Sequence, residues 1–260
     1  MLPSGVGTQQ SFYEDASVYD ILHTPGTALE VDGLERVERR FVPERARGVW
    51  LEPACGTGRY LRVAAGRGRR VVGFDRSAGM IAYARRRHER LGLDGRFFVG
   101  DMTRFASRVR PRCGLAFNPI NSLRHLMGDA AVLAHLEQMS VALRRGGVYA
   151  VGLSTCAYGL ESESEDVWVA HRGVTRVRQV VQYLPPEGDR VERVISHVTV
   201  RTPRGVREID SVYGLRSYSR AQWRRLVDRS AMRVVAVVDE HGRDMDEPEF
   251  GYAVYVLAAR

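Results

Sequence analysis

Short apolar runs and helix-like segments alternate along the first 155 residues. The apolar runs are typical of buried strands and occur at 48–52, 70–75, 96–99, 113–117 and 148–153. The segments with helical patterns lie between them, at 60–65, 78–91 and 129–143. Strands that alternate with helices through five cycles predict a parallel doubly wound sheet, so we expect an α/β fold.

Two further helices are predicted before the first strand. Residues 11–22 place aromatic and apolar side chains at helical spacing, and Gly26 ends that pattern. A second amphipathic helix is predicted from Thr27 to Arg40, with its end near Pro43. Residues 1–10 show no such pattern, so we expect a loose tail there.

After residue 160 the pattern changes to β-branched runs. They cover 167–172, 174–183, 191–201 and 206–215. Turn-forming residues separate them, as at 185–189 and 202–205, so we expect antiparallel hairpins that form a separate small sheet. Val194, Val198 and Val200 fall on one face of their run and His197 on the other, which predicts one buried and one solvated face.

The chain returns to a helix and strands at its end. Ser219 is predicted to cap a helix over 220–230, and strands are predicted at 232–239 and 252–258. We therefore expect N-terminal helices and a Rossmann-like core at 1–160. An inserted antiparallel sheet at 161–217 would act as a lid or a dimer element, and 218–260 would complete the core sheet.

Composition excludes several classes of protein. Hydrophobic residues make up 44% of the chain and charged residues 27%, which is ordinary for a soluble globular protein of one large core. No apolar stretch approaches a membrane span, and the N-terminus lacks a signal sequence, so we expect a cytoplasmic protein. Cys55, Cys113 and Cys156 are scattered, so neither a disulfide framework nor a metal site is expected.

The net charge of +8 raises the question of a nucleic-acid partner. All 39 basic residues are Arg, and most are spread along the chain. Dense runs occur only at 67–70 and 85–87, and the second lies on a predicted surface helix. A nucleic-acid partner is therefore the less favoured interpretation.

The strongest candidate for a ligand site is the strand, turn and helix start at Trp50-Leu51-Glu52-Pro53-Ala54-Cys55-Gly56-Thr57-Gly58-Arg59-Tyr60. Gly56 and Gly58 allow positive φ and a close approach of the backbone to a ligand, and the start of the next helix presents free N–H groups. A dinucleotide fingerprint would need a small residue where Leu61 stands, and Glu52 would repel a pyrophosphate. An NAD-dependent reductase is therefore disfavoured.

Polar residues also follow the later strands. Asp75 and Arg76 come at the end of the second strand, Asp101-Met102 after the third and Asn118 after the fourth. Because the carboxyl ends of parallel strands meet at one edge of a sheet, we expect these side chains to surround one ligand. Met80, in the helix after Asp75, is expected either in the core or beside that ligand.

Glu52, Ala54, Gly56 and Gly58 resemble motif I of class I S-adenosylmethionine (SAM) methyltransferases, Asp/Glu-x-Gly-x-Gly-x-Gly, with Ala54 at the first glycine. Ala keeps the volume small but adopts positive φ less readily. The resemblance covers about residues 45–155. It implies a Rossmann-like seven-stranded methyltransferase sheet with helices on both faces, and SAM as cofactor with S-adenosylhomocysteine as product.

The resemblance also implies roles for the residues at the strand ends. Motif I would cradle the amino-acid half of SAM, and Asp75 would bind both ribose hydroxyls, with Arg76 and Met80 beside it. Asp101 would hold the adenine amino group while Met102 packs against the ring. Asn118 would lie where the fourth strand meets the sulfonium.

The stretch Asn121-Ser122-Leu123-Arg124-His125-Leu126 is similar to Asn-Ser-x-x-His-Leu of glycine N-methyltransferases and to the matching stretch of amino-sugar N-methyltransferases. This similarity implies that Asn121 and Ser122 bind substrate and that His125 lies beside the acceptor. Those families also have a small inserted sheet and an N-terminal aromatic helix that closes over the cofactor. Tyr13 and Tyr19 match that helix, so both are expected to contact the cofactor. Tyr19 is also a candidate catalytic residue that would contact cofactor or substrate.

Methyl transfer to an amine requires an unprotonated nitrogen held in line with the donor, about 3 to 3.5 Å from the methyl carbon. An imidazole with a pKa of about 6.5 can take that proton, which makes His125 a candidate base. His125 could instead cap or pack a helix start, and Tyr19 could be a core residue.

The leading hypothesis is N-methylation of a small-molecule amine. Two alternatives stay open: a nucleic-acid base methyltransferase, and a SAM-binding regulatory or assembly protein without transfer activity. Asn118-Pro119 is similar to the Asn-Pro-Pro-Tyr/Phe motif of the former, but Ile120 and Asn121 replace its last two residues. The sequence leaves open the acceptor, the methylated atom (N, O or S) and the oligomeric state, for which a homodimer is one candidate.

Overall fold

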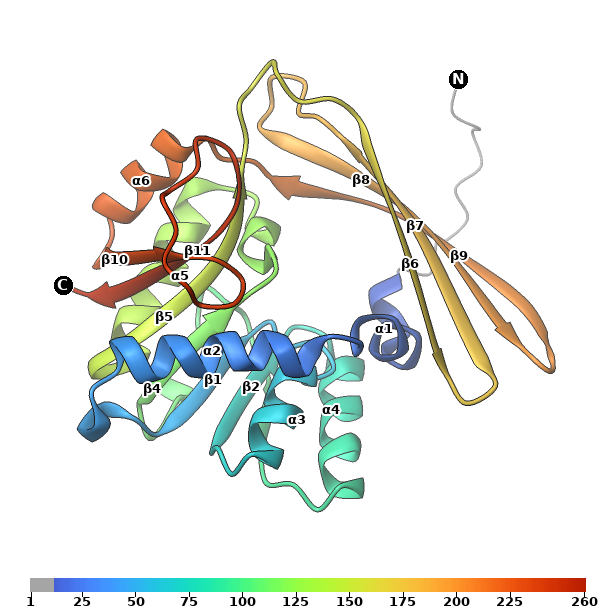
Figure 1. Cartoon of the computed structure of the whole chain (residues 1–260), viewed down its shortest axis with the longest axis horizontal. Helices are drawn as coiled ribbons and strands as arrows, with labels where there is room; N and C mark the ends of the chain where they lie inside the picture. Colours follow the sequence, from blue (N-terminus) through green and yellow to red (C-terminus); the bar gives the residue numbers. More distant parts are fainter. Residues whose placement is uncertain (1–11) are drawn as a thin grey trace.

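The computed structural model describes residues 12–260, so the expected tail at 1–10 lies outside the described residues. Its larger sheet has seven strands in the order β10-β11-β5-β4-β1-β2-β3 (Figure 1). The bounds are β1 Val49–Pro53, β2 Val71–Asp75, β3 Arg96–Val99, β4 Cys113–Asn118, β5 Leu143–Thr155, β10 Met232–Val238 and β11 Gly251–Ala259. Strands β1 to β5 pair in parallel, and β11 runs antiparallel to both β5 and β10.

Helices cover both faces of this sheet (Figure 1). One face carries α2 Thr27–Phe41, α3 Arg59–Gly66 and α4 Ala78–Arg90, and the other carries α5 Asp129–Ala142 and α6 Arg220–Asp228. Successive strand residues point to opposite faces, so Trp50 packs with the first group of helices and Leu51 with the second. Both side chains are fully buried, which confirms the predicted α/β fold.

A second sheet of four antiparallel strands is separate from the first, as expected. Its strands are β6 Ser164–Arg172, β7 Thr175–Leu184, β8 Val191–Thr202 and β9 Gly205–Arg216. Val194, Val198 and Val200 are buried while His197 is only half-buried, so the predicted two-faced character of β8 is confirmed. In Figure 1 the long hairpins of this small sheet extend to one side of the core.

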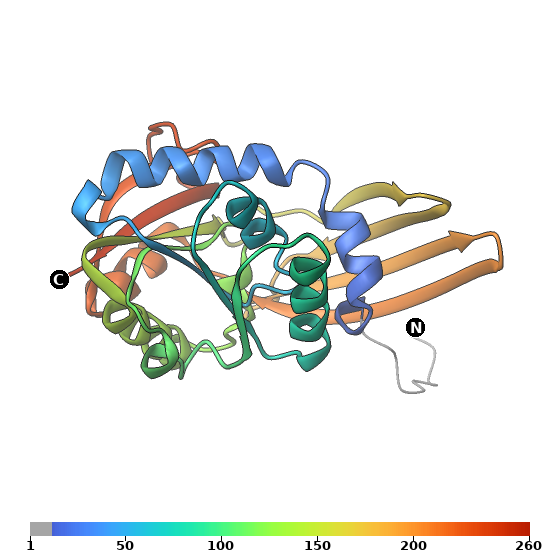
Figure 2. The same ribbon diagram turned by 90° about the horizontal axis from the view of Figure 1, so that it is seen from below.

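The helix α1 (Ala16–His23) lies between the small sheet and the core (Figure 2). Its Val18, Ile21 and Leu22 pack against buried side chains of the small sheet. The sequence predicted one helix over 11–22, which is wrong in detail: a short 3-10 turn at Phe12–Glu14 comes first. Asp15 then starts α1, because its carboxylate accepts a hydrogen bond from the Val18 N–H at 3.1 Å and so caps the helix.

Asp20 joins α1 to three other elements. Its fully buried carboxylate accepts hydrogen bonds from Arg62 of α3 at 2.8 Å, Arg172 of β6 at 2.7 Å and the Tyr83 hydroxyl of α4 at 2.9 Å. Burial by itself would raise the pKa of Asp20, but the two guanidinium groups outweigh it and lower the pKa below its usual value. The Asp20 carboxylate is thus one of the contacts that fix the small sheet to the core, and we call it the Asp20 junction.

Candidate active site

A cavity of about 570 Å³ lies where the carboxyl ends of the core strands face α1 and the small sheet. Almost all the residues singled out from the sequence line it: Tyr13, Tyr19, Glu52, Ala54, Gly56, Asp75, Arg76, Met80, Asp101, Met102, Asn121, Ser122 and His125. Gly58 and Asn118 are the two that do not. The parallel sheet brings Glu52, Asp75 and Asp101 together because it aligns the ends of β1, β2 and β3, whereas Tyr13 and Tyr19 come from segments before β1.

The turn after β1 has the positive φ angles that its glycines predict. Gly56 has φ of 51° and Gly58 of 67°, and Ala54 also adopts positive φ, 49°, although it is not glycine. A Cβ on Gly56 would face the cavity, 3.6 Å from the Tyr19 ring. A Cβ on Gly58 would lie 3.2 Å from Phe97 instead. Gly58 therefore serves the packing of α3 against the core rather than the cavity wall.

Glu52 offers the clearest sign that the cavity holds a polar ligand. Its side chain lines the cavity, the residue is only 5% exposed, and Oε2 has no hydrogen-bond partner within residues 12–260. Burial raises the pKa of this carboxyl, the nearby Asp75 raises it further, and Arg59 opposes both. A buried carboxylate oxygen without a partner is costly. An N–H donor such as the amino group of SAM would satisfy it, so the residues present fit that cofactor.

Asp75 holds the turn as well as facing the cavity. Its Oδ2 accepts the Gly56 N–H at 2.9 Å and its Oδ1 accepts the Ser77 N–H at 2.8 Å. Burial nevertheless raises the pKa of Asp75. A carboxylate has about four lone-pair sites, so both oxygens keep one for a ribose hydroxyl. The sequence indicated the ligand contact but not the contact with Gly56.

At the end of β3, Asp101 and Met102 line the same cavity. The Asp101 carboxylate accepts from the Thr103 hydroxyl at 2.6 Å and N–H at 2.7 Å, and these bonds lower its pKa. Asn118 lies beneath the floor instead: it is 1% exposed, and its amide donates to the Pro53 carbonyl. Asn118 therefore does not line the cavity, and its expected place beside the sulfonium gains no support from the lining.

His125 lies among aromatic rings that also line the cavity. The Tyr13 ring is edge-on at 5.8 Å between centroids, and the Tyr213 ring is stacked at 5.9 Å. Desolvation by the cavity walls lowers the pKa of His125, and the charges of Arg124 and Arg76 lower it further. The imidazole is therefore neutral near pH 7 and can accept a proton.

Asn121 and Ser122 line the cavity, but their polar groups already have partners. The Asn121 side chain donates to the Ser154 hydroxyl at 2.9 Å and accepts from the Ser154 N–H at 2.7 Å. The Ser122 hydroxyl donates to the Ile120 carbonyl at 3.3 Å. Asn121 also has positive φ, 46°, so it shapes the loop that presents His125. Their contact with substrate stays a prediction.

Several lining residues were missed from the sequence: His23, Arg59, Trp168, Gln179, Val181, Tyr183, Tyr213 and Leu215. Most belong to the small sheet, and nothing local in its strands indicates which face meets the cavity. Arg59 could have been found, because it directly follows Gly58 at the start of α3. Its guanidinium donates to the Thr27 hydroxyl at 2.7 Å and pairs with Glu30 at 2.5 Å.

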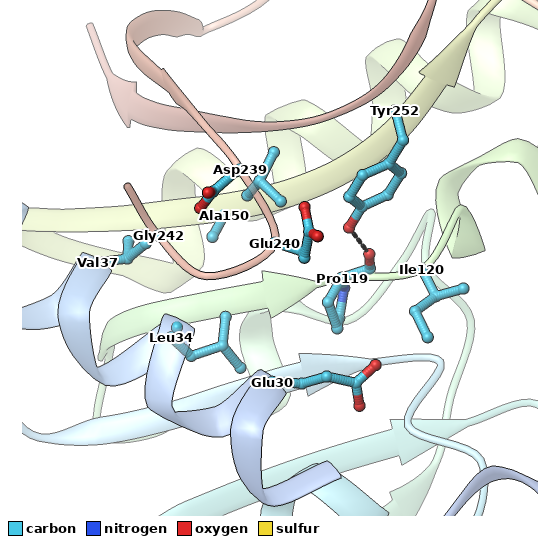
Figure 3. A pocket seen from close by; sticks show the side chains of 12 residues that line it. Glu30, Leu34, Val37, Pro119, Ile120, Ala150, Asp239, Glu240, Gly242 and Tyr252 are labelled. Atoms are coloured by element: carbon cyan, nitrogen blue, oxygen red, sulfur yellow. Dashed lines mark hydrogen bonds between the residues drawn. The ribbon is translucent and has the colours of Figure 1, made fainter. Parts of the chain in front are cut away.

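A second cavity, of about 390 Å³, adjoins the first across Pro119 and Ile120, which line both. Figure 3 shows Tyr252 donating its hydroxyl to the Pro119 carbonyl at the wall of this second cavity. Its lining contains none of the site residues predicted from the sequence. Within residues 12–260 no cluster of metal-binding side chains occurs, and no helix is long and apolar enough to cross a membrane.

The chain is similar to known proteins over most of its length. A family model described as "Methyltransferase domain" matches residues 51–147. A dTDP-3-amino-3,6-dideoxy-alpha-D-glucopyranose N,N-dimethyltransferase from Streptomyces fradiae is 26% identical over 224 residues, which cover 85% of this chain and 84% of the relative.

Solved structures share the fold. DesVI from Streptomyces venezuelae superposes with a TM-score of 0.76 at 24% identity, covering 94% of this chain and 98% of its own. The SAM-bound amino pentose methyltransferase CalS10 from Micromonospora echinaspora superposes with a TM-score of 0.66 at 21% identity, covering 97% and 99%. Residues 51–147 therefore match a methyltransferase domain, and the order of the strands together with the solved structures shows that the chain has the class I methyltransferase fold.

Proposed function

We propose that this protein is a methyltransferase that N-methylates a small molecule. The acceptor that we propose is an amino sugar, in particular one attached to a nucleotide. The Streptomyces fradiae relative is named for such an acceptor, and CalS10 is described as an amino pentose methyltransferase. The observation that carries the proposal is the position of His125, a neutral imidazole that lines the same cavity as Glu52, Asp75 and Asp101.

The residues that line the cavity would have separate roles in methyl transfer. SAM, when bound, supplies a methyl group already activated by the sulfonium. Glu52, Asp75 and Asp101 would hold it by its amino group, ribose and adenine. The protein then has to hold the acceptor nitrogen in line and keep its lone pair free. His125 would take the proton of the incoming ammonium and pass it to solvent, which leaves the amine nucleophilic.

The small sheet would bind the acceptor. Trp168, Tyr183 and Tyr213 present aromatic rings to the cavity from β6, β7 and β9. Flat apolar rings pack well against the C–H faces of a sugar and exclude water, while a phenol hydroxyl can bond a sugar hydroxyl. We therefore propose that residues 161–217 act as the acceptor-binding unit, with 1–160 and 218–260 forming the cofactor-binding core.

The alternatives have less support. No comparison points to a nucleic-acid base methyltransferase, and Ile120 cannot stack on a flipped base as an aromatic residue would. A purely regulatory SAM-binding protein would be favoured by a filled cavity or by a His125 packed away from it. The cavity instead measures about 570 Å³, and His125 lines it.

The test is incubation of the purified protein with SAM and a panel of acceptors, read by mass for the gain of one methylene. The panel pairs each nucleotide-linked and free amino sugar with the sugar that has a hydroxyl in place of the amine. We expect methylation of the amine only. Methylation of the hydroxyl sugar, or of DNA or RNA in place of any sugar, would overturn the proposal.

Three other expectations stay predictions. Metal independence is tested by assaying with and without a chelator, and we expect equal rates. A cytoplasmic location is tested by fractionation of cells. A homodimer is tested by sedimentation of the purified protein. The small sheet is the surface that we expect a second subunit to contact.

A further inference from the structure

Three buried polar side chains form a continuous run beneath the floor of the cavity. His135 of α5 and Tyr149 of β5 are fully buried, and Asn118 of β4 is 1% exposed. The His135 Nδ1 lies 3.0 Å from the Met102 carbonyl oxygen, and its Nε2 lies 3.1 Å from the Tyr149 hydroxyl. The Tyr149 hydroxyl lies 2.7 Å from Asn118 Oδ1, and the Asn118 amide donates to the Pro53 carbonyl.

The two ends of this run are backbone groups of the cofactor site. Met102 lines the cavity at the end of β3, and Pro53 precedes Ala54, which lines it at the turn after β1. The run therefore joins the segment expected at the adenine to the turn expected at the amino-acid half of SAM. It crosses a region that is otherwise apolar, since Tyr149 belongs to the main hydrophobic cluster.

Polar groups in such a region cost free energy unless each is hydrogen-bonded, and an apolar core would be simpler to build. We propose that His135 and Tyr149 are positioning residues for the cofactor site: with Asn118 they form a bridge that holds the carbonyls of Met102 and Pro53 in place. The bridge acts on the backbone of the site from below, and His135 and Tyr149 are not among the residues that line the cavity.

The hydrogens of the bridge can be counted. It has four contacts, and both end groups are carbonyls that only accept. Burial lowers the pKa of His135 to about 4, so its imidazole is neutral and carries one N–H. Asn118, Tyr149 and His135 then supply three hydrogens for four contacts.

The missing hydrogen decides which tautomer His135 adopts. With the hydrogen on Nε2, the Nδ1 lone pair would face the Met102 carbonyl at 3.0 Å, and neither group could turn away. With the hydrogen on Nδ1, the imidazole donates to the Met102 carbonyl. The contact that lacks a hydrogen is then one of the two at the Tyr149 hydroxyl, which can rotate to donate either to Nε2 or to Asn118. The bridge therefore requires the Nδ1–H tautomer.

The inference rests on the cavity binding SAM, as in the proposed function, but not on the identity of the acceptor. Binding of S-adenosylhomocysteine to the unmodified protein is therefore measured first, by calorimetry. If the unmodified protein does not bind it, the proposed function fails. If it binds, the variants below test the bridge alone.

Three variants separate the two contacts of His135. His135→Asn places an amide near the position of Nδ1 and can keep the contact with Met102. His135→Gln places an amide near the position of Nε2 and can keep the contact with Tyr149. His135→Phe keeps neither contact. We expect the Kd for S-adenosylhomocysteine to rise about tenfold in the Phe variant, with the Asn and Gln variants in between. The KM for the acceptor and the pH profile of kcat should stay unchanged.

The matched control is His88→Phe. His88 is also buried, 3% exposed, and its Nδ1 lies 3.0 Å from the Ala84 carbonyl, but it packs on Phe97 outside the cavity. This change should lower the melting temperature without changing the Kd.

Nitrogen-15 NMR of the unmodified protein should show the Nδ1–H tautomer for His135.

The proposal is overturned by an Nε2–H tautomer at His135, by an unchanged Kd in the Phe variant, or by a parallel rise in the acceptor KM. If the Phe variant does not fold, the Asn and Gln variants carry the test, and an unchanged Kd in both of them overturns it equally.

Discussion

The cavity has two walls that are built differently. The cofactor wall, Glu52, Asp75 and Asp101, comes from the ends of three neighbouring strands of one sheet. The acceptor wall consists of Tyr13, His125, Trp168, Tyr183 and Tyr213, which come from a second sheet and from segments before α1 and after β4. The first wall is set by the register of adjacent strands, whereas the second depends on how separate units dock.

This difference matches the ligand that we propose for each wall. A cofactor that related enzymes share can be held by residues at fixed places on a shared sheet. An acceptor that differs between enzymes can be accommodated by changing side chains on an attached sheet, without disturbing the core. The Asp20 junction and the contacts of α1 fix one wall relative to the other.

The largest effect is expected from removing the proposed base. His125→Ala should lower kcat about 10² to 10⁴-fold while leaving the Kd for SAM nearly unchanged, because the change touches the acceptor wall alone. Because the pKa of His125 is lowered, the base is lost only as pH falls through a value below its usual one of about 6.5. The acidic fall of kcat should therefore lie below that pH and be absent from the variant. A matching loss of cofactor affinity would make His125 structural.

The next effect is expected at the Asp20 junction, which joins both walls. Asp20→Ala leaves Arg62 buried without its carboxylate and should cost about 3–5 kcal/mol of unfolding free energy, measured with urea. Because the pKa of Asp20 is lowered, its contribution is present above the unfolded value of about 3.9 and lost as pH falls through the lower folded value.

Arg172→Gln is the control for this change, because the Arg172 side chain is 36% exposed and its loss should cost less. Asp20→Ala should also raise the KM of both SAM and acceptor. A change in only one KM would mean that the walls are not joined at this residue.

A smaller effect is expected within the cofactor wall. Glu52→Gln should raise the Kd for SAM about tenfold or more, since a hydrogen bond to a charged group contributes about 1.5–3 kcal/mol. The same change removes a buried carboxylate with one unbonded oxygen, so the ligand-free protein should melt at a higher temperature. Lower stability together with unchanged affinity would show that Glu52 is a core residue, not a ligand contact.

The smallest effect is expected at Ala54. Its positive φ costs about 1–2 kcal/mol, which Ala54→Gly relieves, but the added glycine entropy of the unfolded chain offsets about 0.4–1 kcal/mol. The net change in unfolding free energy should be stabilising, between about 0 and 1.6 kcal/mol, with cofactor affinity unchanged. Destabilisation in a urea melt would mean that the alanine methyl has a packing role that outweighs the strain.

Most of the fold could be predicted from the sequence, because a buried strand is a short apolar run and turn residues mark its ends. The same runs located Glu52, Asp75 and Asp101, whose positions follow from strand ends alone. Asn118 also ends a strand, but its side chain lies beneath the floor rather than in the cavity. The chain pattern places a residue at the sheet edge without fixing where its side chain points.

What the sequence by itself determined is therefore the α/β core, the separate small sheet and the strand ends that carry Glu52, Asp75 and Asp101, because apolar runs and turn residues are local patterns. Only the tertiary structure decided that Trp168, Tyr183 and Tyr213 face the cavity, that Asp20 joins both units and that His135 reaches Met102. Each of these contacts spans many residues of chain and depends on how whole elements pack. Packing is a property of surfaces that local patterns do not encode.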